Sequence, residues 1–291
     1  MSAALFVYDD ATRFLDETGA FLKSFPAGNS MIAMPAARVV RAPNEDDAGI
    51  YFAAVKIDGE VVAVACHGNS GGTLMSAAPD EAVSLIARDM AARGRRPDSV
   101  VAPLRECETF AGVWSDLTGA GWSRRFHLRQ FELTSVPATR ISPGRLRAPD
   151  PDECVQIVAW QLAFIDEAGL PEAPQRMQRN LERRIARGLI RVWDAAAPQA
   201  GDARDMVAFS GFNTNEDTAR IAPVYTPPPL RGRGYATAMV TELARELFAM
   251  GKKAIYLTTD VANPTSNGIY QRIGFRPVVD HFHFDLAYPD A

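Results

Sequence analysis

The apolar positions of the C-terminal half fall into short runs separated by polar turns, a pattern typical of strands alternating with helices. Short runs rich in β-branched and aromatic side chains predict strands at Leu189–Trp193, Met206–Phe212, Arg220–Tyr225, Ala254–Thr259 and Phe282–Leu286. Apolar residues at helical spacing predict a helix from Tyr235 to about Met250. A second helix is expected after Asn263, ending at Gly274-Phe275.

The N-terminal half shows the same order of elements. A hairpin is expected where the Asp58-Gly59 turn joins two apolar strands, and a third strand, a helix, a strand, a helix and a last strand follow. The predicted bounds are Tyr51–Ile57, Val61–Cys66, Thr73–Ser76, Glu81–Arg93, Ser99–Pro103, Thr109–Gly119 and His127–Leu133. The element order thus repeats after about 140 residues, which indicates a duplicated unit.

This pattern predicts an α/β protein of two similar domains, each a mixed, mostly antiparallel twisted sheet flanked by helices. The connecting segment Ser135–Pro149 contains three prolines and a glycine, and such residues mark linkers. We therefore expect one domain at residues 1–138 and a second at residues 145–291.

A glycine-rich loop connects the strand Arg220–Tyr225 to the helix beginning at Tyr235. It follows three consecutive prolines and reads Arg231-Gly232-Arg233-Gly234-Tyr235-Ala236. A glycine-rich turn into a helix start presents backbone N–H groups and the positive end of the helix dipole, which suits a phosphate. The loop lacks the Gly-Lys-Ser/Thr ending of a Walker loop and the third glycine of the dinucleotide motif.

Together with the segment after Ala254–Thr259, this loop resembles the GNAT superfamily of acyl-CoA-dependent N-acyltransferases. The diphosphate loop of that family reads Arg/Gln-x-x-Gly-x-Gly/Ala, matched here by Arg231, Gly234 and Ala236. Its following segment, Asn-x-x-Ala/Ser-x-x-φ-Tyr-x-x-x-Gly-Phe, is matched in order by Asn263, Ser266, Ile269, Tyr270, Gly274 and Phe275. The close match covers residues 205–286.

The resemblance implies acetyl-CoA as co-substrate. It implies that the loop holds the diphosphate and that the open edge of the strand ending at Tyr225, interrupted by Pro223, pairs with the pantetheine arm. The residues expected at this site are Val224, Tyr225, Thr226, Arg231, Gly232, Arg233, Gly234, Tyr235, Ala236, Thr237, Asn263, Ser266, Asn267 and Tyr270. No metal is expected.

Two of these residues have more than one interpretation. Asn263 precedes Pro264 and begins a helix as a turn residue, and its side chain can also bond a pantetheine amide. Tyr270 is one helical turn beyond Ser266, on a face that is ordinarily core. The resemblance places the Tyr270 hydroxyl near the CoA sulfur, where it would protonate the departing thiolate.

The general base is not identified by the pattern. The strand Arg220–Tyr225 carries no carboxylate, so the candidates are Asp260 at the end of the next strand, acting through water, and Asp166 or Glu167. His281, His283 and Asp285 alternate with Phe282, Phe284 and Leu286 on the last strand. We interpret the polar set as a wall of the acceptor pocket, in preference to a metal site.

The N-terminal copy departs from the family pattern at the loop. Ala77-Ala78-Pro79-Asp80-Glu81 offers no glycine and carries two carboxylates, and Trp114 occupies the position of Tyr270. We expect this copy to keep the fold, to bind no CoA and to shape the acceptor cleft of the other copy.

Composition limits the possible partners and the cellular location of the protein. The 291 residues are 47% hydrophobic and 23% charged with a net charge of −4, which is typical of soluble domains and argues against nucleic acid as partner. No apolar run is long enough to span a membrane, and Cys66, Cys107 and Cys154 lack metal or disulfide spacing. These features predict a cytoplasmic protein, a monomer or homodimer.

The function expected from these observations is acetyl transfer from acetyl-CoA to an amine by direct attack. The acceptor is a small molecule or a peptide, and its identity is not encoded in any motif. The alternative is a regulatory module that senses acyl-CoA without turnover.

Overall fold

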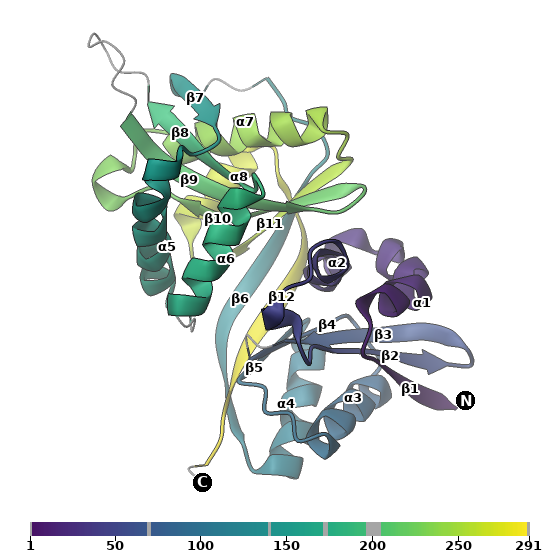
Figure 1. Cartoon of the computed structure of the whole chain (residues 1–291). Coiled ribbons are helices and arrows are strands. Elements are labelled where there is room, and N and C mark those ends of the chain that lie inside the picture. Colours follow the sequence, from purple (N-terminus) through teal and green to yellow (C-terminus); the bar gives the residue numbers. More distant parts are fainter. Residues whose placement is uncertain (1, 69–70, 139–140, 171–173, 196–204, 290–291) are drawn as a thin grey trace. The chain divides into compact units, whose positions relative to one another are not determined.

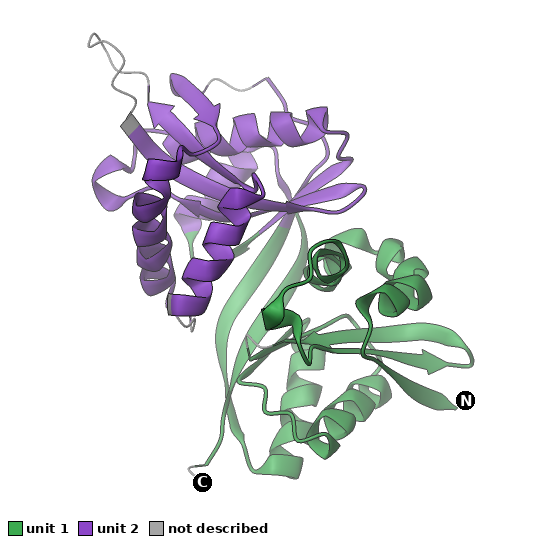
Figure 2. Ribbon diagram, viewed as in Figure 1, with its two compact units in different colours: residues 1–130, 258–263, 277–291 green, residues 131–257, 264–276 purple. Residues whose placement is uncertain are grey.

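The computed structural model describes residues 2–68, 71–138, 141–170, 174–195 and 205–289. The chain divides into two compact units, each described by itself. Unit 1 comprises residues 1–130, 258–263 and 277–291, and unit 2 comprises residues 131–257 and 264–276 (Figure 2).

Unit 1 is a sheet covered by helices on both faces (Figure 1). Its strands, in spatial order, are β1 (Ala3–Tyr8), β2 (Tyr51–Ile57), β3 (Glu60–His67), β4 (Gly72–Met75), β5 (Ser99–Ala102), β12 (Arg276–Ala287) and β6 (Gly121–Leu133). Its helices are α1 (Ala11–Ser24), α2 (Pro26–Arg41), α3 (Asp80–Ala92) and α4 (Leu104–Thr118), with the short turn η1 (Glu45–Asp47) after α2. Strands β4 and β5 are parallel, whereas β1 to β4 pair antiparallel.

The alternation along β2 explains why helices cover both faces of this sheet. Tyr51, Ala53 and Val55 pack in one cluster with α3 and α4. Phe52 and Ala54 pack in another cluster with α1 and α2. Successive side chains of a strand point to opposite faces, so an uninterrupted apolar run such as this one requires cover on each side.

Unit 2 repeats this order. Its strands are β7 (Gly144–Arg147), β8 (Ile190–Ala195), β9 (Asp205–Thr214), β10 (Thr218–Tyr225) and β11 (Ala254–Asp260), whose last residues are assigned to unit 1. Its helices are α5 (Cys154–Ala168), α6 (Pro174–Ala186), α7 (Tyr235–Ala249) and α8 (Pro264–Ile273), with short turns η2 (Pro151–Glu153) and η3 (Pro228–Leu230). One apolar cluster joins α7 and α8 to the sheet, and another joins α5 and α6 to it.

The predicted duplication and fold class are confirmed. The series β2-β3-β4-α3-β5-α4-β6 recurs as β8-β9-β10-α7-β11-α8-β12. In each series two antiparallel pairings precede one parallel pairing, β4 with β5 and β10 with β11. Both sheets are therefore mixed and mostly antiparallel.

The compact units do not follow the contiguous ranges 1–138 and 145–291 expected for the domains. Residues 277–291 belong to unit 1 because β12, although it closes the second series, pairs antiparallel with β5 from Phe282↔Ala102 to Asp285↔Ser99. Residues 139–140, inside the expected linker, lie outside the described residues.

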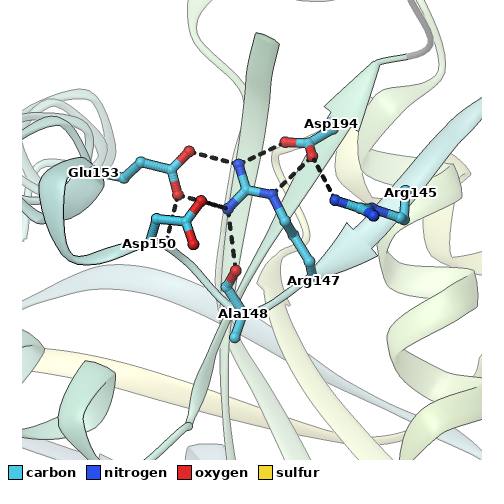
Figure 3. A network of polar contacts seen from close by, with 6 residues as sticks. All are labelled: Arg145, Arg147, Ala148, Asp150, Glu153 and Asp194. Carbon is cyan, nitrogen blue, oxygen red and sulfur yellow. Dashed lines mark hydrogen bonds and ion pairs between the residues drawn. The ribbon is translucent and has the colours of Figure 1, made fainter. Parts of the chain in front are cut away.

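A network of ion pairs around Arg147 fixes the start of α5 to the edge of the sheet (Figure 3). The guanidinium donates to Asp194 on β8 at 2.7 and 2.8 Å and to Glu153, just before α5, at 2.5 and 2.6 Å. The Arg147 side chain is 11% exposed and that of Asp194 is 7% exposed. These short, bidentate contacts connect β7, β8 and the N-terminal end of α5.

Candidate functional site

Strand β10 has an open edge over its C-terminal half. It pairs with β11 only from Thr218↔Ala254 to Arg220↔Tyr256, while the strand itself runs on to Tyr225. On its other side the register with β9 shifts between Ile221 and Val224. The interruption predicted at Pro223 is therefore present as a bulge, and among the described residues the β11-facing edge from Ile221 to Tyr225 has no strand partner.

Side chains from α6 and β9 support the bulge. Arg184 of α6 donates from Nη2 to the Ala222 carbonyl at 2.7 Å, and the Ser210 hydroxyl donates to the Pro223 carbonyl at 2.9 Å. Gly211 makes room for this contact, since a Cβ there would lie 2.2 Å from Arg184 Nη2. The bulge carbonyls are thus satisfied without a strand ladder.

The loop after β10 leads into the exposed N-terminus of α7. Gly232 and Gly234 have φ angles of 78° and 81°, and Gly234 is the N-cap of the helix. No side chain caps this end, and the first helical bond runs from the Ala238 N–H to the Gly234 carbonyl at 3.0 Å. The N–H groups of Tyr235, Ala236 and Thr237 precede that bond and have no acceptor in the described part of the chain, so this helix end can offer donors and a positive dipole to an anion.

Ser142 contacts the same loop at Arg233 and Gly234. Its hydroxyl donates to the Arg233 carbonyl at 2.7 Å. A Cβ at Gly234 would lie 2.5 Å from that hydroxyl, whereas a Cβ at Gly232 would meet nothing within 4 Å. Gly234 is therefore required for both its backbone angle and its close contact, and Gly232 for its angle alone.

The Arg231 side chain makes three contacts with other residues of unit 2. Its Nε donates to the Thr226 carbonyl at 2.8 Å, its Nη2 donates to Glu167 at 2.6 Å, and its guanidinium lies 5.5 Å from the centre of the Tyr225 ring. The Tyr225 hydroxyl donates to the other Glu167 oxygen at 2.8 Å. Glu167 therefore joins the end of α5 to both the strand and the loop.

The electrostatics of this cluster disfavour Glu167 as a base. Burial raises the pKa of its carboxyl, but the hydrogen bonds from Arg231 and Tyr225 and the charge of Arg231 outweigh that effect and leave the pKa below its usual value. Burial, and then the hydrogen bond to Glu167, raise the pKa of Tyr225. Both Glu167 oxygens are engaged and the group stays ionised.

Thr226, directly after β10, carries a buried side-chain oxygen without a partner. Among the described residues, Oγ1 makes no hydrogen bond, although the Thr226 carbonyl accepts from Arg231. A buried hydroxyl without a partner in a folded chain is unusual and is expected where a ligand supplies the missing bond.

Tyr270 lies on α8 and is 8% exposed. Its ring packs against Phe131 and Phe275, with centroids 6.4 and 6.0 Å apart. Burial raises the pKa of the phenol to about 12, and the hydroxyl makes no hydrogen bond to another described residue. The group is thus protonated at neutral pH, as a proton donor must be.

The remaining predicted residues lie at the start of α8 and the end of β11. Asp260 and Asn263 belong to unit 1, whereas Ser266 and Asn267 lie on α8 in unit 2. The Asp260 carboxylate accepts from the Ala262 N–H at 2.9 Å, and its carbonyl accepts from the Asn263 N–H at 3.0 Å. Both residues thus shape the turn that leads into α8, and their roles toward a ligand remain predictions.

The predicted alternation along β12 is confirmed from Phe282 to Leu286, whereas His281, predicted on the polar face, is buried at 3% exposure. The role of the polar set as a pocket wall stays a prediction. Phe282, Phe284 and Leu286 lie in the core of unit 1, and His283 and Asp285 share the other face with Nε2 and Oδ1 3.2 Å apart. Burial, against the charge of Asp285, lowers the pKa of His283. No group of three or more His, Cys, Asp or Glu side chains in the described part of the chain is arranged to hold a metal ion. No helix described here is long and apolar enough to cross a bilayer.

Sequence reasoning did not identify Arg184, Ser210 or Ser142 as parts of the site. Each is distant in sequence from the residue it supports. One signal was available, because a glycine inside a strand, such as Gly211 in β9, marks a close approach of other atoms.

Comparison with known proteins identifies the architecture. The model of the "Acetyltransferase (GNAT) family" matches residues 160–275. A search of the curated proteins finds no match.

Solved structures match over nearly the whole chain. A GCN5-related N-acetyltransferase from Sphaerobacter thermophilus is 17% identical with a TM-score of 0.62, over 99% of this chain and 97% of that one. A GNAT-family acetyltransferase from Colwellia psychrerythraea is 12% identical with a TM-score of 0.57, over 98% and 100%. A tandem GNAT protein from the clavulanic acid biosynthesis pathway is 14% identical with a TM-score of 0.56, over 100% of both chains. At these identities the likeness establishes the shared fold.

Proposed function

Residues 160–275 belong to the GNAT family of acetyltransferases, and from that premise we propose that this chain transfers an acetyl group from acetyl-CoA to an amine. Membership of the family supports acyl transfer in general. The choice of acetyl-CoA and of an amine acceptor is our proposal. It rests on the open edge of β10 leading directly into the free helix end at Gly234.

The residues of β10 and the following loop fit the parts of an acyl-CoA. The unpaired edge at Val224, Tyr225 and Thr226 suits the two amides of the pantetheine arm, and the orphaned Thr226 hydroxyl supplies a further bond. We propose that the loop from Arg231 to Thr237 offers backbone donors to a diphosphate and that Arg231, held by Thr226 and Glu167, borders it. Asn263, Ser266 and Asn267 are proposed to complete the site.

The bound thioester supplies an activated acetyl group whose leaving group is a thiolate. The amine nitrogen attacks the carbonyl carbon, the carbon–sulfur bond breaks, and no acetyl group is attached to the protein. Tyr270 would deliver its phenolic proton to the sulfur. With a pKa of about 12 the phenol is a weaker acid than a thiol, whose usual pKa is about 8.5, so this proton transfer is uphill by itself. It is completed when solvent reprotonates the Tyr270 phenolate.

Asp260 is the carboxylate that we propose as the base, acting through water on the acceptor amine. Glu167 is less suited, because hydrogen bonds occupy both of its oxygens. Asp166 beside it is exposed and remains an alternative. In this scheme Glu167 holds the cofactor loop and takes no proton.

The N-terminal series is proposed to be a copy that has lost CoA binding. Helix α3 begins at Asp80 behind Pro79, with no side-chain cap. Asp80 and Glu81 stand in its first turn, where the C-terminal series has Tyr235 and Ala236. Two carboxylates at this end oppose a diphosphate, so one acetyl-CoA per chain is expected.

The acceptor is proposed to be a small molecule or a peptide amine, used in the cytoplasm by a monomer or homodimer. Calorimetric titration of the full chain with acetyl-CoA tests the binding step. The proposal expects saturable binding at one site per chain. Two equal sites would contradict the inactive N-terminal copy, and no binding would overturn the proposal. Binding without consumption in the presence of amines would favour an acyl-CoA sensor.

A further inference from the structure

Unit 1 contains a cavity that plays no part in the acyl-transfer site. It has a volume of about 370 Å³ and lies among the end of β1, the start of β2, the end of α2 and the segment after α3. Cavities that hold small organic ligands have volumes of about 300–1,000 Å³.

One part of the cavity wall is apolar or aromatic, and the rest is polar. Val39, Ile50 and Phe52 line it together with the rings of Tyr8 and Tyr51. Both tyrosine hydroxyls are already engaged, that of Tyr8 with Glu17 at 2.9 Å and that of Tyr51 with Asp89 at 3.0 Å. The tyrosines therefore contribute their rings to the wall, and a ligand placed there must present an apolar surface.

The acidic side chains at the wall bring little free negative charge to it. Asp47 is neutralised by a bidentate pair with Arg38 and also accepts from the Asn44 N–H at 2.8 Å. Asp9 is exposed to solvent, and its charge acts on Arg13.

Two arginines supply the positive charge. Arg93 donates from Nε to Asp89 at 2.7 Å, and the same carboxylate accepts from the Tyr51 hydroxyl. Arg95 has no carboxylate partner among the described residues: its Nη1 donates to the Gly49 carbonyl at 2.7 Å, and its guanidinium lies 5.9 Å from the centre of the Tyr51 ring. These contacts fix the Arg95 fork and leave further N–H donors, which is the geometry that recognises a carboxylate.

We propose that this cavity binds a small organic carboxylate bearing one aromatic or branched apolar group. The carboxylate lies against Arg95, with Arg93 beside it, and the apolar group lies among Tyr8, Tyr51 and Phe52. This site is independent of the acyl-CoA site in its residues and in its ligand.

The probes are 3-phenylpropanoate and its neutral amide, 3-phenylpropanamide, observed by saturation-transfer NMR on the full chain. The proposal expects transfer to the carboxylate and at least tenfold weaker binding of the amide, because a charge-assisted bond is lost. Equal binding of the amide, or no binding of the carboxylate at millimolar concentration, overturns the proposal. Displacement of the probe by acetyl-CoA also overturns it, since the probe would then occupy the other site.

Arg95→Gln should weaken binding of 3-phenylpropanoate by at least tenfold. The matched control is Arg96→Gln, because Arg96 is next in sequence but lies over the Tyr288 ring at 4.3 Å, and it should leave binding unchanged. If Arg95→Gln does not fold, Val39→Phe is the second test. Its larger side chain, on α2, should fill part of the cavity and abolish binding of 3-phenylpropanoate. Retention of binding in a folded Val39→Phe or Arg95→Gln protein contradicts the proposal.

Discussion

Glu167 and Arg231 form an ion pair, 2.6 Å between Oε2 and Nη2, that joins the C-terminal end of α5 to the glycine-rich loop. The same arginine holds the Thr226 carbonyl through Nε, so strand end, loop and helix meet at one guanidinium. Arg231 and Glu167 remain 46% and 40% exposed, and such pairs contribute little to folding. We infer that the pair orders the loop before acetyl-CoA arrives.

Glu167→Ala should therefore weaken acetyl-CoA binding with little change in melting temperature. Ordering one long side chain on binding costs about 0.5–1.5 kcal/mol, which corresponds to about two- to tenfold in affinity. The measurement is calorimetric titration, with Asp166→Ala as the matched control at the neighbouring exposed carboxylate. Tighter binding in Glu167→Ala would show instead that Glu167 competes with the diphosphate for Arg231.

Gly234→Glu should lower acetyl-CoA affinity by more than Gly234→Gln does. Both side chains collide equally with the Ser142 hydroxyl and suffer the same positive φ, so the comparison isolates the negative charge at the helix end. We expect Gly234→Glu to bind acetyl-CoA at least about tenfold more weakly than Gly234→Gln, because a charge-assisted hydrogen bond contributes about 1.5–3 kcal/mol. Equal affinities in two folded variants would place the diphosphate elsewhere.

Tyr270→Phe should lower kcat by about 10²-fold, within the range for general acid catalysis. Affinity for acetyl-CoA should change little, and so should stability, because the Tyr270 hydroxyl makes no hydrogen bond to another described residue. The checks are kcat at saturating acetyl-CoA and a melting curve. A core role alone would leave kcat at the wild-type value.

The raised pKa of Tyr270 also sets an expectation for pH. With a folded pKa of about 12, the phenol stays protonated well above its usual pKa of about 10, and its proton is lost only as pH rises toward 12. Below about pH 10, the pH profiles of kcat for the wild type and for Tyr270→Phe should therefore have the same shape. A decline of kcat with rising pH in the wild type alone would contradict the raised pKa.

Arg147→Leu should destabilise unit 2 far more than Arg145→Leu. The Arg147 side chain is 11% exposed, and its removal leaves the Asp194 carboxylate, which is 7% exposed, without its main charged partner. We therefore expect the free energy of unfolding to fall by about 3–5 kcal/mol. Arg145 lies 3.7 Å from the same carboxylate but is 58% exposed, so its loss should cost about 1 kcal/mol or less. Denaturant unfolding measures both, and similar losses would show that the buried network in Figure 3 contributes no special stability.

The elements that were predicted from sequence are those with local signals. The Asp58-Gly59 turn gave the β2–β3 hairpin, and apolar spacing gave α3 and α7. Helices α1 and α2 were not predicted. In α2, Pro35, Gly28 and Ser30 oppose helix formation, and burial of the first turns decides the structure instead. The pairing of β12 with β5 joins segments about 180 residues apart, and no local pattern specifies it.

The same distinction holds at the site. The glycine-rich loop Arg231–Thr237 and the interruption of β10 at Pro223 were predicted because consecutive residues and their backbone preferences specify both. The partners Glu167, Arg184, Ser210 and Ser142 come from other elements, and only the fold brings them to the loop and the bulge. Glu167 was predicted as a candidate base, but both of its oxygens accept hydrogen bonds from Arg231 and Tyr225, so we propose a positioning role for it instead.

Transfer itself is the most direct test of the proposed function. The full chain is incubated with acetyl-CoA and a panel of amines comprising amino acids, polyamines, aminoglycosides and peptides, and free thiol release and product mass are followed. The account predicts amine-dependent thiol release and an acetylated amine, both reduced by about 10²-fold in Tyr270→Phe. Saturable acetyl-CoA binding with no thiol release and no acetylated product across the panel would contradict it.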